Sequence, residues 1–584
     1  MGHSAVRERR KKRAHLREKS VRNEPTETAE PPGKELGVIV RGSLADGLEM
    51  RLHEGVSVEE LRVGKFVVAQ GERSRFFALL SDVQLAASHP GILLRPPRPE
   101  ETLSRAVLSG TSTFGNVKLR PMLMVPNDAV AGDEESLLPV KTVPAHFSPV
   151  CEANREDVGH IFGDERRSPK FFHVGTPLDM ETPVCLNLDR WVERSNAIFG
   201  KSGTGKTFLT RLCLCGVIKA EKAVNLIFDM HSEYGWQGTT EQAGRSSVRG
   251  LKQYFRSRVQ IFTLDPASSR RRQVPFDEAI RIPYSQITVE DILLLQRELN
   301  LNATALETCY LLVRKFKQKT WLQQFLDMSV EDIKEFVGEN NAHQGALSAL
   351  QRKLLTLTEQ CKDFLVPDGD PDDDAVDKIL NTLRSGRHVV LEFGQNDRPV
   401  QYMLVVNILT RRLHSIYVEE TERYLSQSGP KPHPLVITIE EAHKFLAPGL
   451  ADQTIFGTIA REMRKYNVTL LIVDQRPSGI DDEVLSQVGT KICCLLDDEK
   501  DIDAVLTGVN GASSLRSVLT SLETRQQAMI FGHAVPMPVV VRTRLYDDEA
   551  FRQAMTTGLA PAEQDEDPQA RRERLIRDHE LDFA

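Results

Sequence analysis

The sequence predicts an α/β fold in which a P-loop nucleotide-binding core follows a small β-barrel. Three observations carry this prediction. Residues 200–207 fit the pattern GxxxxGK[ST], and they lie between an apolar run at 197–199 and a helix-like segment at 208–217. A second apolar run at 435–439 ends in acidic residues. Short β-rich runs separated by glycines occupy residues 36–83, as in small barrels.

The P-loop pattern predicts a site for a nucleoside triphosphate. Its glycines let successive backbone N–H groups converge on the β-phosphate at a helix N-terminus. Lys206 is expected to reach the β- and γ-phosphate oxygens, and the Thr207 hydroxyl to hold Mg²⁺. A chance match in a glycine-rich loop is the alternative, and the strand before the motif and the helix after it argue against this. We therefore expect ATP and Mg²⁺ as ligands, bound by Gly200, Ser202, Gly203, Thr204, Gly205, Lys206 and Thr207.

Acidic residues after the run at 435–439 are expected to complete a catalytic site, because α/β sheets place their chemistry at the carboxyl ends of strands. Glu440 is expected to hold Mg²⁺ through water, and Glu441 to polarise the attacking water. The metal-side residue is usually Asp, so Glu440 is a departure that affects the metal contact. Gln475, after the apolar run at 469–473, is the expected γ-phosphate sensor. Without a P-loop, two such acids are most often a solvated strand end.

Composition restricts the class of protein. The chain has 584 residues, of which 40% are hydrophobic and 27% are charged, with a formal net charge of −7. These values are ordinary for a soluble globular protein of about two to four domains. No apolar run approaches the ~20 residues of a membrane-spanning helix, and no apolar stretch follows the basic N-terminal segment, so we expect a cytoplasmic protein without a membrane partner. The eight cysteines show no CxxC or zinc-ligand spacing, which argues against a disulfide scaffold or a zinc site.

Charge and turn residues divide the chain into segments. Residues 1–23 carry nine Lys or Arg against two Glu, and a segment rich in proline follows. Such an arm binds phosphates or an acidic partner, or is simply solvated. Apolar faces at helical spacing indicate an insertion within the core. The expected segments are a basic arm and linker at 1–35, a β-barrel at 36–165, the ATPase core at 166–550 with its helical insertion at about 285–370, and a C-terminal tail at 551–584.

Several motifs occur in a specific order along the chain. After the P-loop come DMHSEY at 229–234, IEEAHKFLAP at 439–448, IAREMRKYNVTLLIVDQRPSGID at 459–481 and SLETRQQAMIFG at 521–532. Together they resemble the HerA-type hexameric DNA translocases, prokaryotic relatives of the FtsK motor. The resemblance covers about residues 36–545 and implies a RecA-like core with a HAS-type barrel and a helical insertion. It also implies a homohexamer around double-stranded DNA that works with a NurA-like nuclease or another effector, in DNA end processing or anti-phage defence.

The resemblance also implies that an arginine from the neighbouring subunit completes each ATP site. Arg464, expected on a helix before the strand at 469–473, is the first candidate, and Arg194, before the P-loop strand, is the second. A surface ion pair is the alternative for each. The family commonly has Gly where this chain has Met463, which affects the packing of that helix. Basic residues at 270–272 and within the stretch 245–258 are candidates for contacts with DNA phosphates or form a solvated face. Without a base-reading motif, binding is expected to be sequence-independent.

Two other functions compete with DNA translocation. A stand-alone kinase or metabolic P-loop enzyme requires a substrate pocket, for which the sequence offers no motif. An ATP-gated ring scaffold would instead use the barrel to recruit and activate a defence effector, with little translocation. Hydrolysis stimulated by DNA favours the motor, whereas hydrolysis stimulated only by the partner favours the scaffold.

Overall fold

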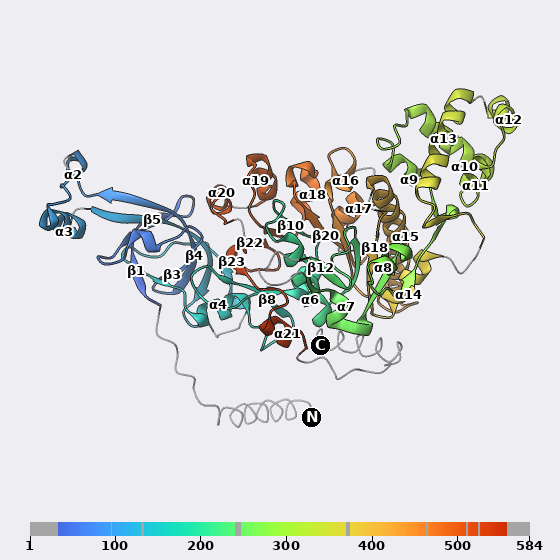
Figure 1. Cartoon of the computed structure of the whole chain (residues 1–584). Helices are drawn as coiled ribbons and strands as arrows, with labels where there is room; N and C mark the ends of the chain where they lie inside the picture. The colour runs from blue at the N-terminus through green and yellow to red at the C-terminus, as the bar shows by residue number, and fades with distance from the viewer. Residues whose placement is uncertain are drawn as a thin grey trace, which may run out of the picture.

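The chain consists of a β-barrel at one end, a central sheet flanked by helices, and a group of helices that projects at the other end (Figure 1). This computed structural model describes residues 33–556 except 95, 112, 130–133, 240–246, 341, 370–373, 397, 452–453, 463–464, 510–511 and 524–525. The fold is the predicted one, a RecA-like P-loop core with an N-terminal barrel and a helical insertion. The basic run near the N-terminus and the acidic C-terminal segment lie outside the described residues.

Six antiparallel strands close the barrel within the described residues. In spatial order they are β2 (Gly47–Leu52), β1 (Glu35–Ser43), β7 (Pro149–Glu152), β3 (Phe66–Gln70), β4 (Ser74–Ala87) and β5 (Thr113–Pro126). The pairing of β2 with β5 closes the barrel, and β6 (Leu138–Pro139) pairs with residues 123–124 of β5. The β4–β5 hairpin extends past the barrel and carries α2 (Pro90–Leu94) and α3 (Thr102–Thr111) at its tip (Figure 1). These two helices were not predicted.

Strand β3 joins the barrel to the ATPase core, because its two faces pack into different hydrophobic clusters. Val67 and Ala69 are buried inside the barrel. Phe66 and Val68 lie on the opposite face, as the two-residue period of a strand requires, and pack into the main core. The Phe66 ring centroid lies 6.2 Å from that of Phe162, the last residue of α4 (Arg155–Phe162), which belongs to the same main cluster. The barrel is therefore packed directly against the core.

The central sheet has twelve strands within the described residues, and its parallel part carries the predicted nucleotide site. The parallel strands, in spatial order, are β15 (Glu278–Ala279), β14 (Val259–Thr263), β18 (His388–Glu392), β11 (Val224–Asp229), β19 (Leu435–Glu440), β20 (Val468–Asp474), β10 (Asn196–Phe199) and β21 (Thr490–Cys493). The sheet continues antiparallel through β22 (Gln527–Gly532), β23 (Val539–Thr543), β8 (Phe171–Pro177) and β9 (Val184–Asn187). Strands β11, β19, β20 and β10 are successive neighbours, so their carboxyl ends lie at one edge.

Helices flank this sheet, and the last described one is packed onto it. The helices are α4 (Arg155–Phe162), α5 (Leu188–Val192), α6 (Lys206–Lys219), α7 (Leu251–Phe255), α8 (Pro266–Arg271), α14 (Ala375–Arg384), α15 (Pro399–Leu425), α16 (His443–Leu446), α17 (Ile455–Glu462), α18 (Asp482–Gln487), α19 (Glu499–Leu506), α20 (Ala512–Thr520) and α21 (Glu549–Thr556). Short pairs join β12 (Gln237–Thr239) to β13 (Ser247–Arg249) and β16 (Ile282–Pro283) to β17 (Leu365–Val366). In α21 Phe551 and Met555 are buried, so the packed structure extends past the boundary expected at 550.

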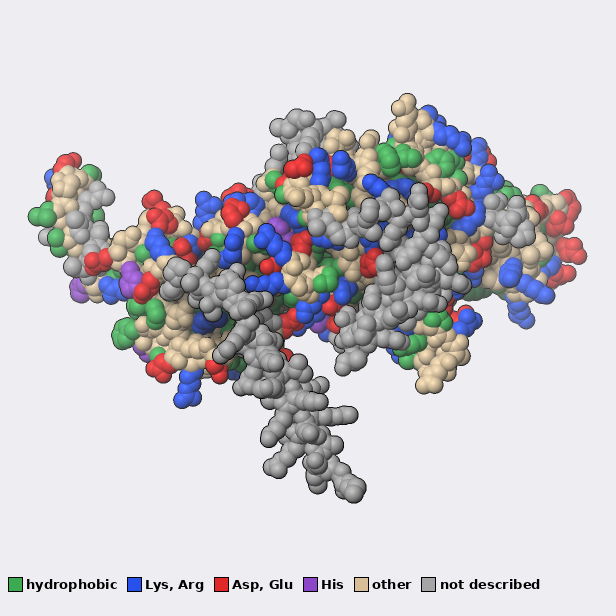
Figure 2. All heavy atoms as spheres, turned by 90° about the horizontal axis from the view of Figure 1, so that it is seen from below, with side chains coloured by type: hydrophobic (Ala, Val, Ile, Leu, Met, Phe, Trp, Pro, Cys, Tyr) green, Lys and Arg blue, Asp and Glu red, His purple; other side chains and the backbone are tan. Residues whose placement is uncertain are grey.

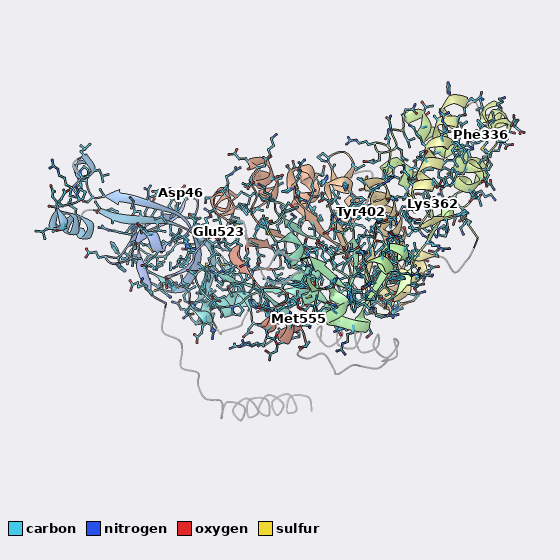
Figure 3. The ribbon with its side chains drawn as sticks, in the orientation of Figure 1. Asp46, Phe336, Lys362, Tyr402, Glu523 and Met555 are labelled. Carbon is cyan, nitrogen blue, oxygen red and sulfur yellow. The ribbon has the colours of Figure 1, made fainter. Side chains whose placement is uncertain are left out.

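The helical insertion has its own packed interior and is tied to α15. It comprises α9 (Val289–Leu294), α10 (Ala303–Phe316), α11 (Trp321–Leu326), α12 (Val330–Asn340) and α13 (Gln344–Gln360). Phe336 marks it in Figure 3. The buried carboxylate of Asp291 binds Arg411 and Asn407 of α15, each at 2.7 Å. Among the described helices, none combines the length and apolarity that crossing a bilayer requires.

Candidate nucleotide-binding and hydrolysis site

The P-loop has the backbone shape that phosphate binding requires. It connects β10 to α6, and Gly203 and Gly205 have φ values of 77° and 100°, in the left-handed region that favours glycine. A Cβ at Gly200 would lie 2.7 Å from the Cβ of Cys494, so a side chain at Gly200 would clash. Gly205 caps α6 without a side-chain hydrogen bond, which leaves the first turn of the helix to an anion.

Polar contacts within the loop set the position of its lysine. Lys206 Nζ donates to the carbonyl oxygen of Lys201 at 2.9 Å, and the buried Thr204 hydroxyl donates to the same oxygen at 2.7 Å. Burial lowers the pKa of Lys206, although Glu440 and Glu441 act in the opposite direction. The ammonium group therefore lies in a partly desolvated position, where its attraction to phosphate is strong.

A cavity of about 560 Å³ brings the two predicted motifs together. On one side α6 contributes Lys206 and Thr207, and on the other the ends of β19 and β20 contribute Glu440, Glu441 and Gln475. These residues come from segments more than 200 positions apart, and the strand order places them at the same edge of the sheet. Ser202, Gly203 and Gly205 also line the cavity. Gly200 and Thr204 instead contact other parts of the protein: Gly200 packs against Cys494, and the Thr204 hydroxyl bonds within the loop.

Glu440 occupies a buried position with one oxygen available for a ligand. Its Oε1 accepts a hydrogen bond from the Tyr234 hydroxyl at 2.8 Å. The Tyr402 hydroxyl, near the centre of Figure 3, bonds to the backbone of the same glutamate. Among the described residues none donates to Glu440 Oε2, which is buried. Burial, reinforced by the charge of Asp229, raises the pKa of Glu440 to about 8.

This donor set fits Mg²⁺, which prefers oxygen ligands and keeps several waters. The orphaned Oε2 of Glu440 and the hydroxyl of Thr207 both belong to residues that line the cavity. A bound cation would favour the ionised form of Glu440 and compensate the cost of burying its charge. The substitution of Glu for the usual Asp is therefore compatible with a metal at this edge of the sheet.

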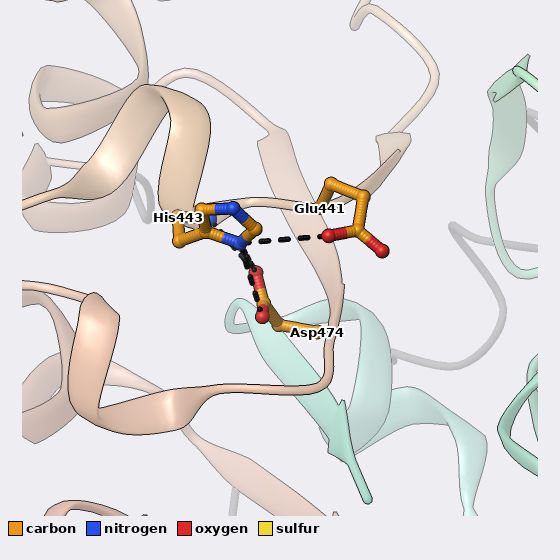
Figure 4. Close-up of side chains that lie close together, drawn as sticks. All are labelled: Glu441, His443 and Asp474. Atoms are coloured by element: carbon orange, nitrogen blue, oxygen red, sulfur yellow. Dashed lines mark hydrogen bonds and ion pairs between the residues drawn. The ribbon is translucent and has the colours of Figure 1, made fainter. Parts of the chain in front are cut away.

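Glu441 has one hydrogen bond to its carboxylate and a longer contact with a histidine. Its backbone has φ = 50°, an uncommon conformation for a residue other than glycine. Gln475 Nε2 donates to Oε1 at 3.2 Å, and His443 Nδ1 lies 3.7 Å from Oε2. His443 Nδ1 also lies 3.0 Å from Oδ2 of Asp474 (Figure 4). Gln475, predicted as a γ-phosphate sensor, thus contacts the predicted water-polarising residue directly.

Several polar residues of this site were not predicted from the sequence. Asp229 is fully buried at the end of β11 and accepts backbone N–H groups of Glu233 and Tyr234, each at 2.8 Å. Arg211 is buried on α6, and its Nε donates to the carbonyl oxygen of Glu233 at 3.0 Å. His443 and Asp474 were likewise missed. For Asp229 and Asp474 a signal was present, since each is an acid at the carboxyl end of a buried strand.

Of the two candidate arginines only Arg194 lies within the described residues, and it does not line this cavity. Arg464 lies outside the described residues. Arg194 precedes β10, and its side chain packs against Gly489, so it lies at the amino end of the strand whose carboxyl end carries the P-loop. Arg194 could therefore contact only a nucleotide that is bound to a neighbouring subunit. Arg461, on α17 three positions before Arg464, has its Nε atom 4.0 Å from a carboxylate oxygen of Glu483.

The candidate DNA-contacting residues are only partly available to a ligand. Arg272 Nη2 donates to the buried Glu392 at 3.3 Å, and Arg270 lies over the ring of Phe276. On the face shown in Figure 2, Lys and Arg side chains are interspersed with Asp and Glu. This mixed pattern does not favour phosphate binding over that face.

Comparison with known proteins identifies the family. The family described as "Helicase HerA, central domain" matches residues 172–413, and the HAS barrel domain matches residues 36–135. The DNA double-strand break repair helicase HerA of Sulfurisphaera tokodaii is 30% identical over 416 residues, covering 68% of this chain and 73% of the relative. The protein of the same name from Sulfolobus acidocaldarius is 25% identical over 404 residues, covering 68% and 73%.

Solved structures resemble the chain more distantly. VirB4 of Thermoanaerobacter pseudethanolicus aligns with a TM-score of 0.42 and 12% identity over 64% of this chain and 96% of that chain. The bacterial conjugative coupling protein TrwB aligns with a TM-score of 0.42 and 13% identity over 63% and 88%. These values are too low to support an argument about function. The family matches and the 30% identical relative do support one: the chain belongs to the HerA helicase family and is a P-loop ATPase.

Proposed function

We propose that this chain is the subunit of a homohexameric motor that uses ATP hydrolysis to translocate along double-stranded DNA without regard to sequence. The observation that carries the proposal is the single cavity in which the P-loop and Glu441 converge, in a chain of the HerA family. The names of the relatives, DNA double-strand break repair helicases, support DNA as the substrate. DNA end processing with a NurA-like nuclease is the proposed setting, with anti-phage defence beside another effector as the alternative, and the cytoplasm is the proposed location.

The proposed mechanism gives each residue of the cavity a separate task. Lys206 and the backbone of the P-loop bind the β- and γ-phosphates, and Thr207 and Glu440 hold Mg²⁺. When bound at these residues, Mg²⁺ would supply positive charge that offsets the charge of the phosphate oxygens. Glu441 accepts the proton of the attacking water, and Gln475 orients Glu441 and senses the γ-phosphate. An arginine of the adjacent subunit, Arg464 first and Arg194 second, stabilises the transition-state charge.

Linear double-stranded DNA is expected to raise ATP turnover, and to do so equally for two unrelated sequences. Phosphate contacts release counterions, so DNA affinity should fall by about 10³-fold or more between 50 and 200 mM salt. A coupled ATPase assay measures the first effect, and displacement of a DNA-bound roadblock measures translocation. Lys206→Ala protein is the inactive control. Turnover that ignores DNA but rises with the effector alone would replace the motor with the scaffold.

One observation supports effector docking, which the motor and the ATP-gated scaffold, the second candidate function, have in common. The tip of the β4–β5 hairpin exposes Leu85, Leu94 and Leu103, whose exposed fractions are 82%, 82% and 79%. These side chains lie on an arm that projects away from the rest of the chain (Figure 1). Exposed apolar groups on a projecting arm are typical of protein interaction sites. The arm therefore supports the proposal that the barrel docks an effector, whichever function the ring performs.

The double substitution Leu94→Glu/Leu103→Glu is expected to abolish co-purification with the effector encoded beside this chain, while ATP turnover stays unchanged. Two charges at the tip would have to be desolvated on docking. Leu425→Glu on α15, where the side chain is 72% exposed, is the matched control. Full effector affinity in the double variant would exclude the tip of this arm as the docking site. Deleting residues 1–165 is a poorer test, because it would remove β3 and expose the main core.

A further inference from the structure

The side chain of His443 lies between two carboxylates at the hydrolysis site. Its Nδ1 lies 3.0 Å from Asp474 Oδ2 and 3.7 Å from Glu441 Oε2 (Figure 4). Gln475 donates a hydrogen bond to the other oxygen of Glu441, whereas His443 lies near Oε2 at ion-pair distance. A single ring nitrogen thus connects the group proposed to activate water to a buried acid on the neighbouring strand.

Asp474 fixes the position of this histidine. It is 1% exposed at the end of β20, and its Oδ2 accepts both the backbone N–H of His443, at 2.8 Å, and the ring nitrogen. Its Oδ1 accepts the backbone N–H of Arg476 at 2.8 Å. Because a carboxylate only accepts hydrogen bonds, the proton of the imidazole is assigned to Nδ1. The same hydrogen bond raises the pKa of His443, which agrees with this assignment.

We propose that His443 is a positioning residue for ATP hydrolysis: Asp474 anchors its ring through Nδ1–H, and the ring, at ion-pair distance from Glu441 Oε2, keeps that carboxylate turned toward the attacking water. The proposal rests on the proposed role of Glu441. A general base acts only from the correct distance and direction, and a displacement of about 1 Å costs about 10²-fold in rate. The arrangement has the logic of a base oriented by a third group, here an acid–histidine pair that acts on a glutamate.

Three substitutions separate the role of Nδ1 from that of the ring. His443→Ala removes the donor, His443→Asn places an amide nitrogen near the position of Nδ1, and His443→Gln places it near Nε2. His443→Ala and His443→Gln are expected to lower kcat by about 10²-fold with little change in KM for ATP, and His443→Asn to restore most of kcat. Lys444→Ala, in the same short helix, is the control that leaves both carboxylates untouched.

A double-mutant cycle shows whether His443 acts through Glu441. In the Glu441→Gln background, removing His443 is expected to cause no further loss of residual turnover, because the carboxylate that it positions is already gone. Additive losses, or a turnover of His443→Ala equal to that of the unmodified protein, would overturn the proposal. If His443→Ala does not fold, the comparison of His443→Asn with His443→Gln decides, since equal rates in these two contradict a role of Nδ1.

The same measurements distinguish this inference from the proposed function. If Glu441→Gln keeps its turnover, the proposed role of Glu441 is wrong, and the inference falls with it. If Glu441→Gln is inactive while His443→Ala is fully active, only the inference is wrong. DNA stimulation and translocation are measured separately, so their absence would contradict the proposed motor without affecting the role of His443 in ATP hydrolysis.

Discussion

Glu441→Gln protein is expected to bind ATP with normal affinity and to hydrolyse it about 10²–10⁴-fold more slowly. Glutamine keeps the size of the side chain and an oxygen that accepts the hydrogen bond from Gln475 Nε2, but it cannot take a proton from water. Lys206→Ala is expected to fail earlier, because it removes the ammonium group that neutralises phosphate charge at the start of α6. Equilibrium binding of a fluorescent ATP analogue and steady-state turnover separate these two defects.

The matched control for this experiment is Glu499→Gln, at an exposed position in the first turn of α19. It makes the same chemical change away from the cavity and is expected to leave both binding and turnover unaltered. Steady-state turnover retained in Glu441→Gln would remove Glu441 from its proposed role. Normal ATP affinity and turnover in Lys206→Ala would place the nucleotide elsewhere.

Mixing Lys206→Ala subunits with Arg464→Ala subunits is expected to restore ATP turnover that neither variant has alone. An arginine supplied by a neighbour is worth about 10³–10⁵-fold in rate, so pure Arg464→Ala rings should be nearly inactive. In a randomly mixed ring, about a quarter of the interfaces combine an intact P-loop with an intact arginine. Turnover should therefore rise toward roughly that fraction of the unmodified activity, measured against the mixing ratio.

Mixed rings must first be shown to form, for instance by native mass spectrometry of differently tagged subunits. The same mixture made with Arg194→Ala tests the second candidate, whose position at the amino end of β10 requires a contact in trans. No recovery in confirmed mixed rings would exclude the arginine that was tested. A protein that stays monomeric with ATP would contradict the ring itself.

The elements of the site could be predicted from local sequence, because the residues of each motif are close together in the chain and themselves determine its backbone shape. The P-loop needs only glycines at fixed offsets between a strand and a helix, and the runs before Glu440 and Gln475 are short and strongly apolar. The contacts of His443 with Asp474 depend instead on β19 and β20 being neighbours. That adjacency follows from strand order, which local periodicity does not encode.

The barrel shows the same division between local and non-local information. Alternating residues and glycine turns predicted strands between residues 36 and 83, where the structure has β1 to β4, but they did not predict β5 and β7. They did not predict that β4 and β5 continue into an arm with α2 and α3, since the segment at 90–111 lacks strong helical signals. Nor does the pattern of β3 show that its two apolar faces are buried against different parts of the molecule.

Because the two faces of β3 pack into different clusters, the strand couples the stability of the barrel to that of the ATPase core. Lys65, next to the strand, adds ion pairs to Glu152 on the barrel side at 2.7 Å and to Asp179 on the core side at 3.1 Å. Unfolding of the barrel alone would remove Phe66 from its partners in the core, so we expect the barrel and the core to lose structure together on heating. Because β3 is packed on both faces, we expect a torque that a docked protein applies to the barrel to be transmitted to the sheet that carries the P-loop.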